Sequence, residues 1–145
     1  PFLDPDNQVI RLAKKVEAGA EFIQTQAIYD IEKFEKWMEM VRDKGLHQKV
    51  SILAGITPLK SSGAARYMKA KIPGIDIPDE VIERLRSVGT KEQVSREGLK
   101  IAVETISRVK EIEGIAGVHI MPLEWEEAVP QICQASGLYP RPLSE

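Results

Sequence analysis

The sequence predicts an α/β fold built on a parallel β-sheet. Three short apolar segments, at residues 21–25, 50–54 and 117–121, have the length and composition of strands, and a helical pattern follows each one. The order α-β-α-β-α-α-α-β-α is typical of a parallel sheet, as a (β/α)8 barrel or as a doubly wound sheet. Closing a barrel takes about eight strands, so three strands alone leave two open sheet edges, which we expect to be completed by other residues or by a second copy of the chain.

The first predicted helix and strand end in a candidate ligand-binding residue. Asp6 or Asn7 can cap a helix that runs to about residue 17. After a glycine turn, the chain enters the strand at residues 21–25 and leaves it on Gln26. Ligands of parallel α/β folds bind at the carboxyl ends of the strands, so Gln26 is the first residue that we expect to touch a ligand.

The second helix is predicted from Asp30 to about residue 43, with Gly45 as its terminating residue. Its apolar residues recur at spacings of three and four and predict a buried stripe, made of Ile31, Phe34, Trp37, Met38 and Val41. The continuous apolar strand at residues 50–54 has the pattern of a strand buried on both faces. Ser61 or Ser62 then caps a short helix at residues 64–70.

The remaining elements follow the same pattern of helix and strand. Pro78 at the first helical position, followed by two acidic residues, predicts a short helix. A long helix is predicted from residue 91 or 92 to residue 112, ahead of the third strand. A last helix at residues 125–135 contains Pro130, which predicts a kink or break near Glu126 or Glu127.

The composition is that of a globular domain with a core: 145 residues, 43% hydrophobic and 29% charged. A net charge of -2 gives no basic surplus for nucleic acid or an anionic membrane. With a single cysteine, Cys133, no internal disulfide can form, and we expect a buried structural thiol. Without an apolar run of about 20 residues or a signal peptide, a cytoplasmic location is expected, and the start at Pro1 suggests a piece of a longer protein.

Four ordered strings carry a resemblance: KVEAGAEFIQTQAIYD at 15–30, ILAGITP at 52–58, IPGIDIPDEV at 72–81 and GVHIMPLEW at 117–125. Together they resemble the methylenetetrahydrofolate reductase family in its short bacterial and archaeal form. The resemblance implies that residues 1–145 are a single segment of a (β/α)8 TIM barrel, namely strands six to eight with their helices. The general-acid glutamate of the family follows the first strand, so the resemblance implies no catalytic residue in this chain.

The resemblance also implies substrate-binding residues. Gln26 matches a glutamine that hydrogen-bonds the folate pterin or the nicotinamide, and its amide offers both a donor and an acceptor. Met68 falls where the family often has a ring-packing Phe, and Leu123 matches an apolar clamp on the substrate ring. Thr25 and Thr57 are expected at the same barrel mouth. The structural alternatives are a strand-end amide for Gln26 and core packing for Met68.

For the cofactor, the resemblance implies that Lys15 and Lys14 meet the phosphates of FAD, with Arg11 one turn earlier. The alternative is a solvated helix face. Gln8 stands where the family has an acidic FAD contact, and Trp125 stands where it has an arginine, which leaves open a pterin other than folate. No metal site is expected, because His47 and His119 lack a partner at zinc-ligand spacing.

The function implied is FAD-dependent reduction of 5,10-methylenetetrahydrofolate, or a related pterin, to the 5-methyl form, a step of one-carbon metabolism and methionine biosynthesis. The electron donor would be NAD(P)H or another reductant, and this chain alone would be inactive. Two alternatives stay open. One is an isolated half-barrel that binds itself or a partner without flavin, and the other is a different (β/α)8 enzyme on the same scaffold.

Overall fold

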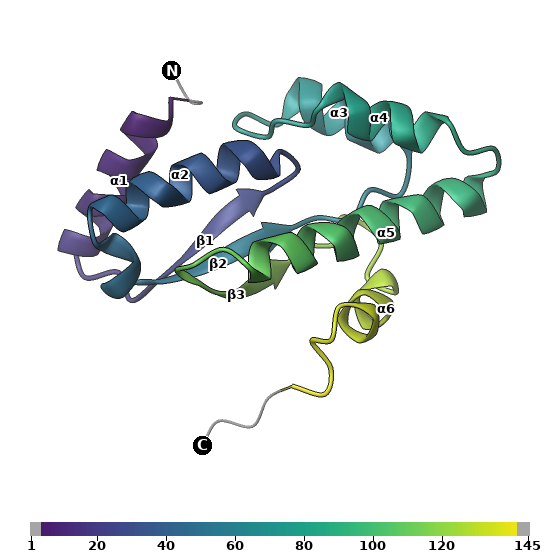
Figure 1. The fold of residues 1–145 in the computed structure, drawn as a ribbon. Helices are drawn as coiled ribbons and strands as arrows, with labels where there is room; N and C mark the ends of the chain where they lie inside the picture. The colour runs from purple at the N-terminus through teal and green to yellow at the C-terminus, as the bar shows by residue number, and fades with distance from the viewer. Residues whose placement is uncertain (1–3, 142–145) are drawn as a thin grey trace.

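The computed structural model describes residues 4–141 and contains an α/β arrangement of helices packed against a small sheet (Figure 1). The elements in chain order are α1 (Pro5–Glu17), β1 (Phe22–Ala27), α2 (Ile31–Asp43), the 3₁₀ turn η1 (Leu46–Gln48), β2 (Ser51–Ile56), α3 (Ser62–Lys71), α4 (Asp79–Arg86), α5 (Lys91–Lys110), β3 (Ile115–Ile120) and α6 (Ala128–Ala135).

The three strands form one parallel sheet in the order β1-β2-β3, which confirms the predicted α/β class with a parallel sheet. Ile23 pairs with Ile52, and Leu53 pairs with Gly117. Strand β2 is therefore central, and β1 and β3 are the two edges. This sheet, with a helix after each strand, is consistent with part of a (β/α)8 barrel.

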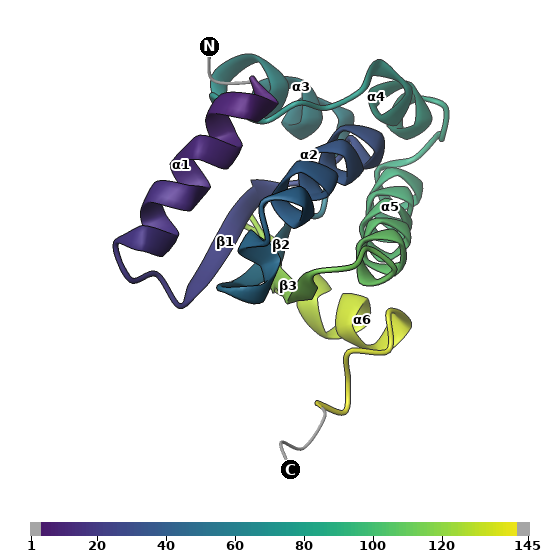
Figure 2. The same cartoon turned by 60° about the vertical axis from the view of Figure 1, so that its left-hand side comes forward.

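The helices cover one face of this sheet (Figures 1 and 2). Ile52 and Ala54 of β2 are fully buried in a core that includes Val9 of α1 and Met38 of α2. The opposite face is open in the described part of the chain, since Phe22 of β1 is 60% exposed. A sheet with helices on one face and the other face exposed is consistent with one part of a barrel wall.

A second core cluster lies where α3, α4 and α5 meet the carboxyl end of the sheet. Tyr29, just after β1, is buried in it and donates a hydrogen bond to the carbonyl oxygen of Thr57 at 2.9 Å. Burial raises the pKa of the Tyr29 hydroxyl well above its ordinary value, so Tyr29 acts as a neutral donor. The bond joins the ends of β1 and β2.

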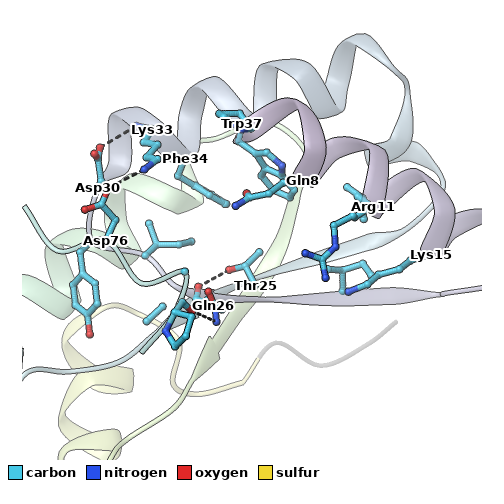
Figure 3. A pocket seen from close by; sticks show the side chains of 18 residues that line it. Gln8, Arg11, Lys15, Thr25, Gln26, Asp30, Lys33, Phe34, Trp37 and Asp76 are labelled. Carbon is cyan, nitrogen blue, oxygen red and sulfur yellow. Dashed lines mark hydrogen bonds and ion pairs between the residues drawn. The ribbon is translucent and has the colours of Figure 1, made fainter. Parts of the chain in front are cut away.

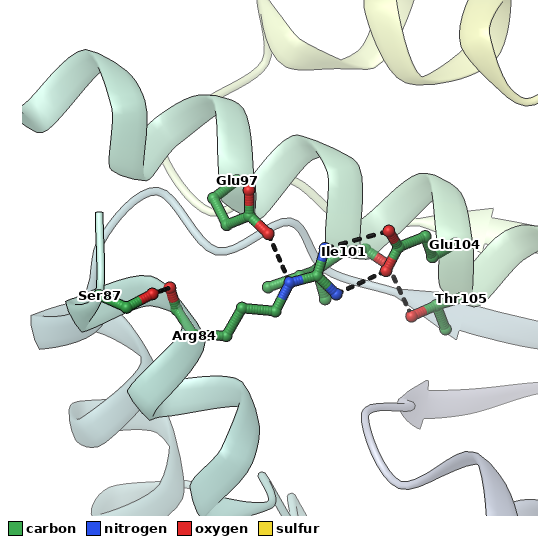
Figure 4. A network of polar contacts seen from close by, with 6 residues as sticks. All are labelled: Arg84, Ser87, Glu97, Ile101, Glu104 and Thr105. Carbon is green, nitrogen blue, oxygen red and sulfur yellow. Dashed lines mark hydrogen bonds and ion pairs between the residues drawn. The ribbon is translucent and has the colours of Figure 1, made fainter. Parts of the chain in front are cut away.

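A charged network ties α4 to α5 (Figure 4). Both outer nitrogens of the Arg84 guanidinium donate to the Glu104 carboxylate, at 2.6 and 3.0 Å, and Nε of Arg84 donates to Glu97. The hydrogen bonds from Arg84 lower the pKa of Glu104, so this pair stays ionised to lower pH than a free carboxyl would.

Several helix boundaries agree with the sequence predictions. Asp30 caps α2, where its carboxylate accepts from the backbone N–H of Lys33 at 3.0 Å. Ser61, rather than Ser62, caps α3 and accepts from Ala64. Gly45 adopts the left-handed conformation expected just after α2.

Three predicted helix starts were wrong, each for a proline-related reason. Helix α1 is capped by Asp4 and not by Asp6 or Asn7, because Pro5 fits the first helical position. In α4, Pro78 is the capping residue and helical geometry begins one residue later. The last helix, α6, begins at Ala128 and not at residue 125, and the turn at Glu126 and Glu127 confirms the break predicted there. Pro130 therefore lies in the first turn, where a missing N–H costs no hydrogen bond.

Candidate functional site

A pocket of about 460 Å³ lies at the free edge of the sheet, between α1, β1, α2 and the connection from α3 to α4 (Figure 3). Its polar lining comes from four separate segments: Gln8, Arg11 and Lys15 of α1, Thr25 and Gln26 of β1, Asp30 and Lys33 around the start of α2, and Asp76 before α4. The last residues of β1 line this pocket, so it lies at the carboxyl end of an edge strand, where parallel α/β folds bind ligands.

Gln26 is exposed at the end of β1 and is held through its side chain. Its Nε2 donates to the carbonyl oxygen of Pro73 at 3.1 Å. The next residue, Gly74, lies directly against Oε1 of the same amide. The amide is therefore fixed by a loop 47 residues away in sequence, while its remaining polar groups stay available to a ligand.

A β-bulge sets the position of Gln26. Three steps along β1, from Gln24 to Ala27, match two steps along β2, from Leu53 to Gly55. Within the bulge, the N–H of Gly55 donates to Oγ1 of Thr25 at 2.9 Å, and the Thr25 hydroxyl donates to the carbonyl oxygen of Gln26 at 2.9 Å. The hydroxyl of Thr25 thus replaces a backbone acceptor and ties the backbone at Gln26 to the central strand.

Two cations on α1 face the same pocket. Arg11 and Lys15 extend from α1 toward β1 (Figure 3), and both are exposed. Within residues 4–141, neither has an acidic partner. Lys14, their neighbour, does not line the pocket. Arg11 and Lys15 are therefore suited to an anionic group that enters between α1 and β1.

The other predicted substrate residues lie elsewhere. Thr57 and Met68 are buried, 6% and 4% exposed, beside the Tyr29 hydroxyl, which lies 3.9 Å from the sulfur of Met68. Leu123, after β3, is 55% exposed. The structure thus brings together Thr25, Gln26, Arg11 and Lys15, and it leaves Thr57, Met68, Leu123 and Lys14 outside the pocket.

Some pocket residues were not predicted as functional. Phe34 and Trp37 belong to the predicted buried stripe of α2, and they also form the apolar wall of the pocket, with the centroids of their stacked rings 5.7 Å apart. Lys33 and Asp76 form an ion pair at 2.8 Å that ties α2 to the loop after Gly74. The ion pair of Lys33 with Asp76 could not be predicted, because these residues are far apart in the sequence. The aromatic pair could have been predicted, because Phe34 and Trp37 are one helical turn apart and follow shortly after Asp30.

A metal centre would need several ligating side chains close together. Across residues 4–141, no group of three or more His, Cys, Asp or Glu side chains is placed to hold a metal ion. Nδ1 of His119 lies 2.9 Å from Nε2 of Gln24, so this strand histidine is hydrogen-bonded across the sheet. Within the same range, no helix combines the length and apolar character needed to cross a bilayer.

These features define a parallel α/β chain with a polar ligand pocket at the carboxyl end of its strands. A family model described as methylenetetrahydrofolate reductase matches residues 2–137. The chain therefore belongs to the methylenetetrahydrofolate reductase family.

Curated relatives carry the same family name. The chain is 32% identical over 139 residues to methylenetetrahydrofolate reductase 1 of Schizosaccharomyces pombe, which covers 95% of this chain and 22% of that protein. It is 29% identical over 130 residues to methylenetetrahydrofolate reductase 2 of Saccharomyces cerevisiae, covering 89% and 21%. It is 30% identical over 132 residues to methylenetetrahydrofolate reductase (NADH) 1 of Arabidopsis thaliana, covering 88% and 21%. The chain thus spans about a fifth of the length of these relatives.

Proposed function

We propose that this chain forms one wall of the substrate site in a flavin-dependent methylenetetrahydrofolate reductase. In this proposal β1, β2 and β3 are strands six to eight of a (β/α)8 barrel, and residues 1–145 are one segment of it. Three observations support the proposal: the parallel order, the bare sheet face with exposed Phe22, and the family match over residues 2–137. The remaining strands would cover the bare face and both edges.

Gln26 carries the substrate role in this proposal. One N–H of its amide is held by Pro73, which leaves a second N–H and lone pairs of Oε1 for a ligand. A pterin ring presents neighbouring donors and acceptors in one plane, which an amide can pair with. Leu123 is exposed after β3 and suits a contact with the ring, whereas burial of Thr57 and Met68 favours a role in supporting the wall.

The α1 cations fit the phosphates of FAD, because two basic side chains of one helix, which have no acidic partner within residues 4–141, face the same pocket. Arg11 and Lys15 would hold the diphosphate, with Lys14 beside them. FAD would supply the redox chemistry of the reduction. NAD(P)H or another reductant would be the electron donor, since the Arabidopsis thaliana relative is named for NADH and a Caenorhabditis elegans relative for NADPH.

The assembly of this chain with the remaining strands of a reductase barrel is called the reconstituted enzyme below. In it, Gln26→Ala should lower kcat/KM for the methylene pterin about 10- to 100-fold, because buried ligand groups lose their hydrogen-bond partner. Steady-state kinetics with varied pterin would measure this loss. Gln48→Ala is the control, because Gln48 is exposed in η1, before β2, at the opposite end of the sheet. Unchanged pterin turnover in Gln26→Ala would show that Gln26 does not bind the substrate.

A second candidate function is a self-associating half-barrel without flavin. The exposed Phe22 on an edge strand favours it, because an unpaired edge with an apolar side chain is a template for pairing with another copy. In that case the chain would form a colourless oligomer, and the pocket cations would face solvent.

A further inference from the structure

The loop between α3 and α4 reaches over the end of β1 and contacts the Gln26 side chain. The carbonyl oxygen of Pro73 accepts from Nε2 of Gln26 at 3.1 Å. Gly74 has a φ of +87°, and a Cβ built there would overlap Oε1 of Gln26 and lie 3.2 Å from its Cδ. The amide oxygen of Gln26 therefore fits in this position only because Gly74 has no side chain.

Both partners of this contact are anchored independently. On the loop side, Asp76 pairs with Lys33 of α2 at 2.8 Å, and Ile77 is fully buried in the second core cluster. On the strand side, the hydroxyl of Thr25 fixes the Gln26 carbonyl at 2.9 Å. Because the backbone of Gln26 and the loop are each held by other contacts, the amide has little freedom to rotate.

We propose that the Pro73–Gly74 turn is a positioning element that sets the orientation of the Gln26 amide toward the pterin. Pro73 accepts one N–H of Nε2, which fixes the donor end of the amide, and Gly74, which has no side chain, leaves room for Oε1. This inference rests on the proposed substrate role of Gln26. It adds that the α3–α4 loop, by orienting the Gln26 amide, determines how well the pterin edge is recognised.

A double-mutant cycle in the reconstituted enzyme tests this inference. Gly74→Ala should raise the pterin Kd and KM about tenfold or more, with a smaller change in kcat, because the amide is pushed out of register. In a Gln26→Ala background, Gly74→Ala should change pterin affinity no further. The matched control is Gly19→Ala, because Gly19 has a similar φ of +94° but nothing within 4 Å of the added methyl.

A second readout needs no turnover. In the 145-residue chain, the side-chain NH₂ signals of Gln26 in a ¹⁵N-edited NMR spectrum should shift in Gly74→Ala and stay unchanged in Gly19→Ala. Should Gly74→Ala fail to fold, Lys33→Met replaces it, because this variant removes the ion pair that anchors the loop and leaves Gln26 intact. Lys33→Met should then shift the same NH₂ signals.

The outcomes separate the two proposals. If Gln26→Ala itself leaves pterin affinity unchanged, the proposed substrate role fails. If Gln26→Ala weakens the pterin but the effect of Gly74→Ala adds to it in full, the turn does not act through Gln26 and only the positioning inference fails. Unchanged Gln26 NH₂ signals in the loop variant that folds would also overturn the positioning inference.

Discussion

Gly98→Ala is expected to lower the free energy of unfolding by about 4 kcal/mol or more, enough to unfold a marginally stable domain. Gly98 is buried in α5, where the helix crosses the loop after β2. A methyl group there would overlap the carbonyl oxygen of Leu59 and lie 2.8 Å from its carbonyl carbon. These are backbone atoms, so no side-chain rotation can relieve the overlap, and α5 would have to move off the core.

Urea denaturation followed by circular dichroism would measure this loss. The sign of the change in unfolding free energy is informative, because a Gly→Ala substitution inside a helix otherwise stabilises a protein by about 1 kcal/mol. Gly63→Ala in α3 is the matched control, since the nearest atom to its methyl, Oγ of Ser61, is 3.7 Å away. A Gly98→Ala chain as stable as Gly63→Ala would mean that α5 does not pack on the loop as described.

Gly55→Ala should have the second largest effect, a loss of about 3 kcal/mol together with a displaced Gln26. The added methyl would lie 2.5 Å from the carbonyl oxygen of Thr25 and 2.6 Å from that of Gln26. The β-bulge would have to open, and the hydrogen bond from Gly55 to the Thr25 hydroxyl would be lost with it. The free energy of unfolding of the chain and the pterin affinity of the reconstituted enzyme should therefore both decrease.

Gly117→Ala on the neighbouring strand is the control for Gly55→Ala. The atom nearest to its methyl is Cδ2 of Leu53 at 3.3 Å, the mobile end of a flexible side chain. Its cost should stay below about 1 kcal/mol. Equal stability losses for the two variants would indicate a general intolerance of the sheet to side chains and not a specific contact at the bulge.

Local features of this fold could be predicted from the sequence because they depend on neighbouring residues. The cap at Asp30 follows from a side chain that reaches a backbone N–H three residues on. The parallel sheet follows from short apolar strands that alternate with helices. The place of Gln26 at a strand end needed only the strand boundary, so its position in the pocket could be predicted as well.

The contacts that orient Gln26 could not be predicted in the same way. The bulge at Thr25 depends on how β1 pairs with Gly55, and nothing within β1 alone signals it. The bond from Gln26 to Pro73 and the ion pair of Lys33 with Asp76 join segments that meet only after the α3–α4 loop has folded over the sheet. The contact of the Met68 sulfur with the Tyr29 hydroxyl likewise joins segments that lie far apart in the sequence.

The most direct test of the proposed function is the flavin absorbance of the purified chain, alone and in the reconstituted enzyme, read across a size-exclusion column. We expect the chain alone to hold no flavin, because in the proposed function α1 would supply only part of the phosphate site. The reconstituted enzyme should elute as one yellow species whose reduced flavin is reoxidised by the methylene pterin. A colourless oligomer of the chain that does not take up the remaining strands would contradict the account and support the self-associating half-barrel.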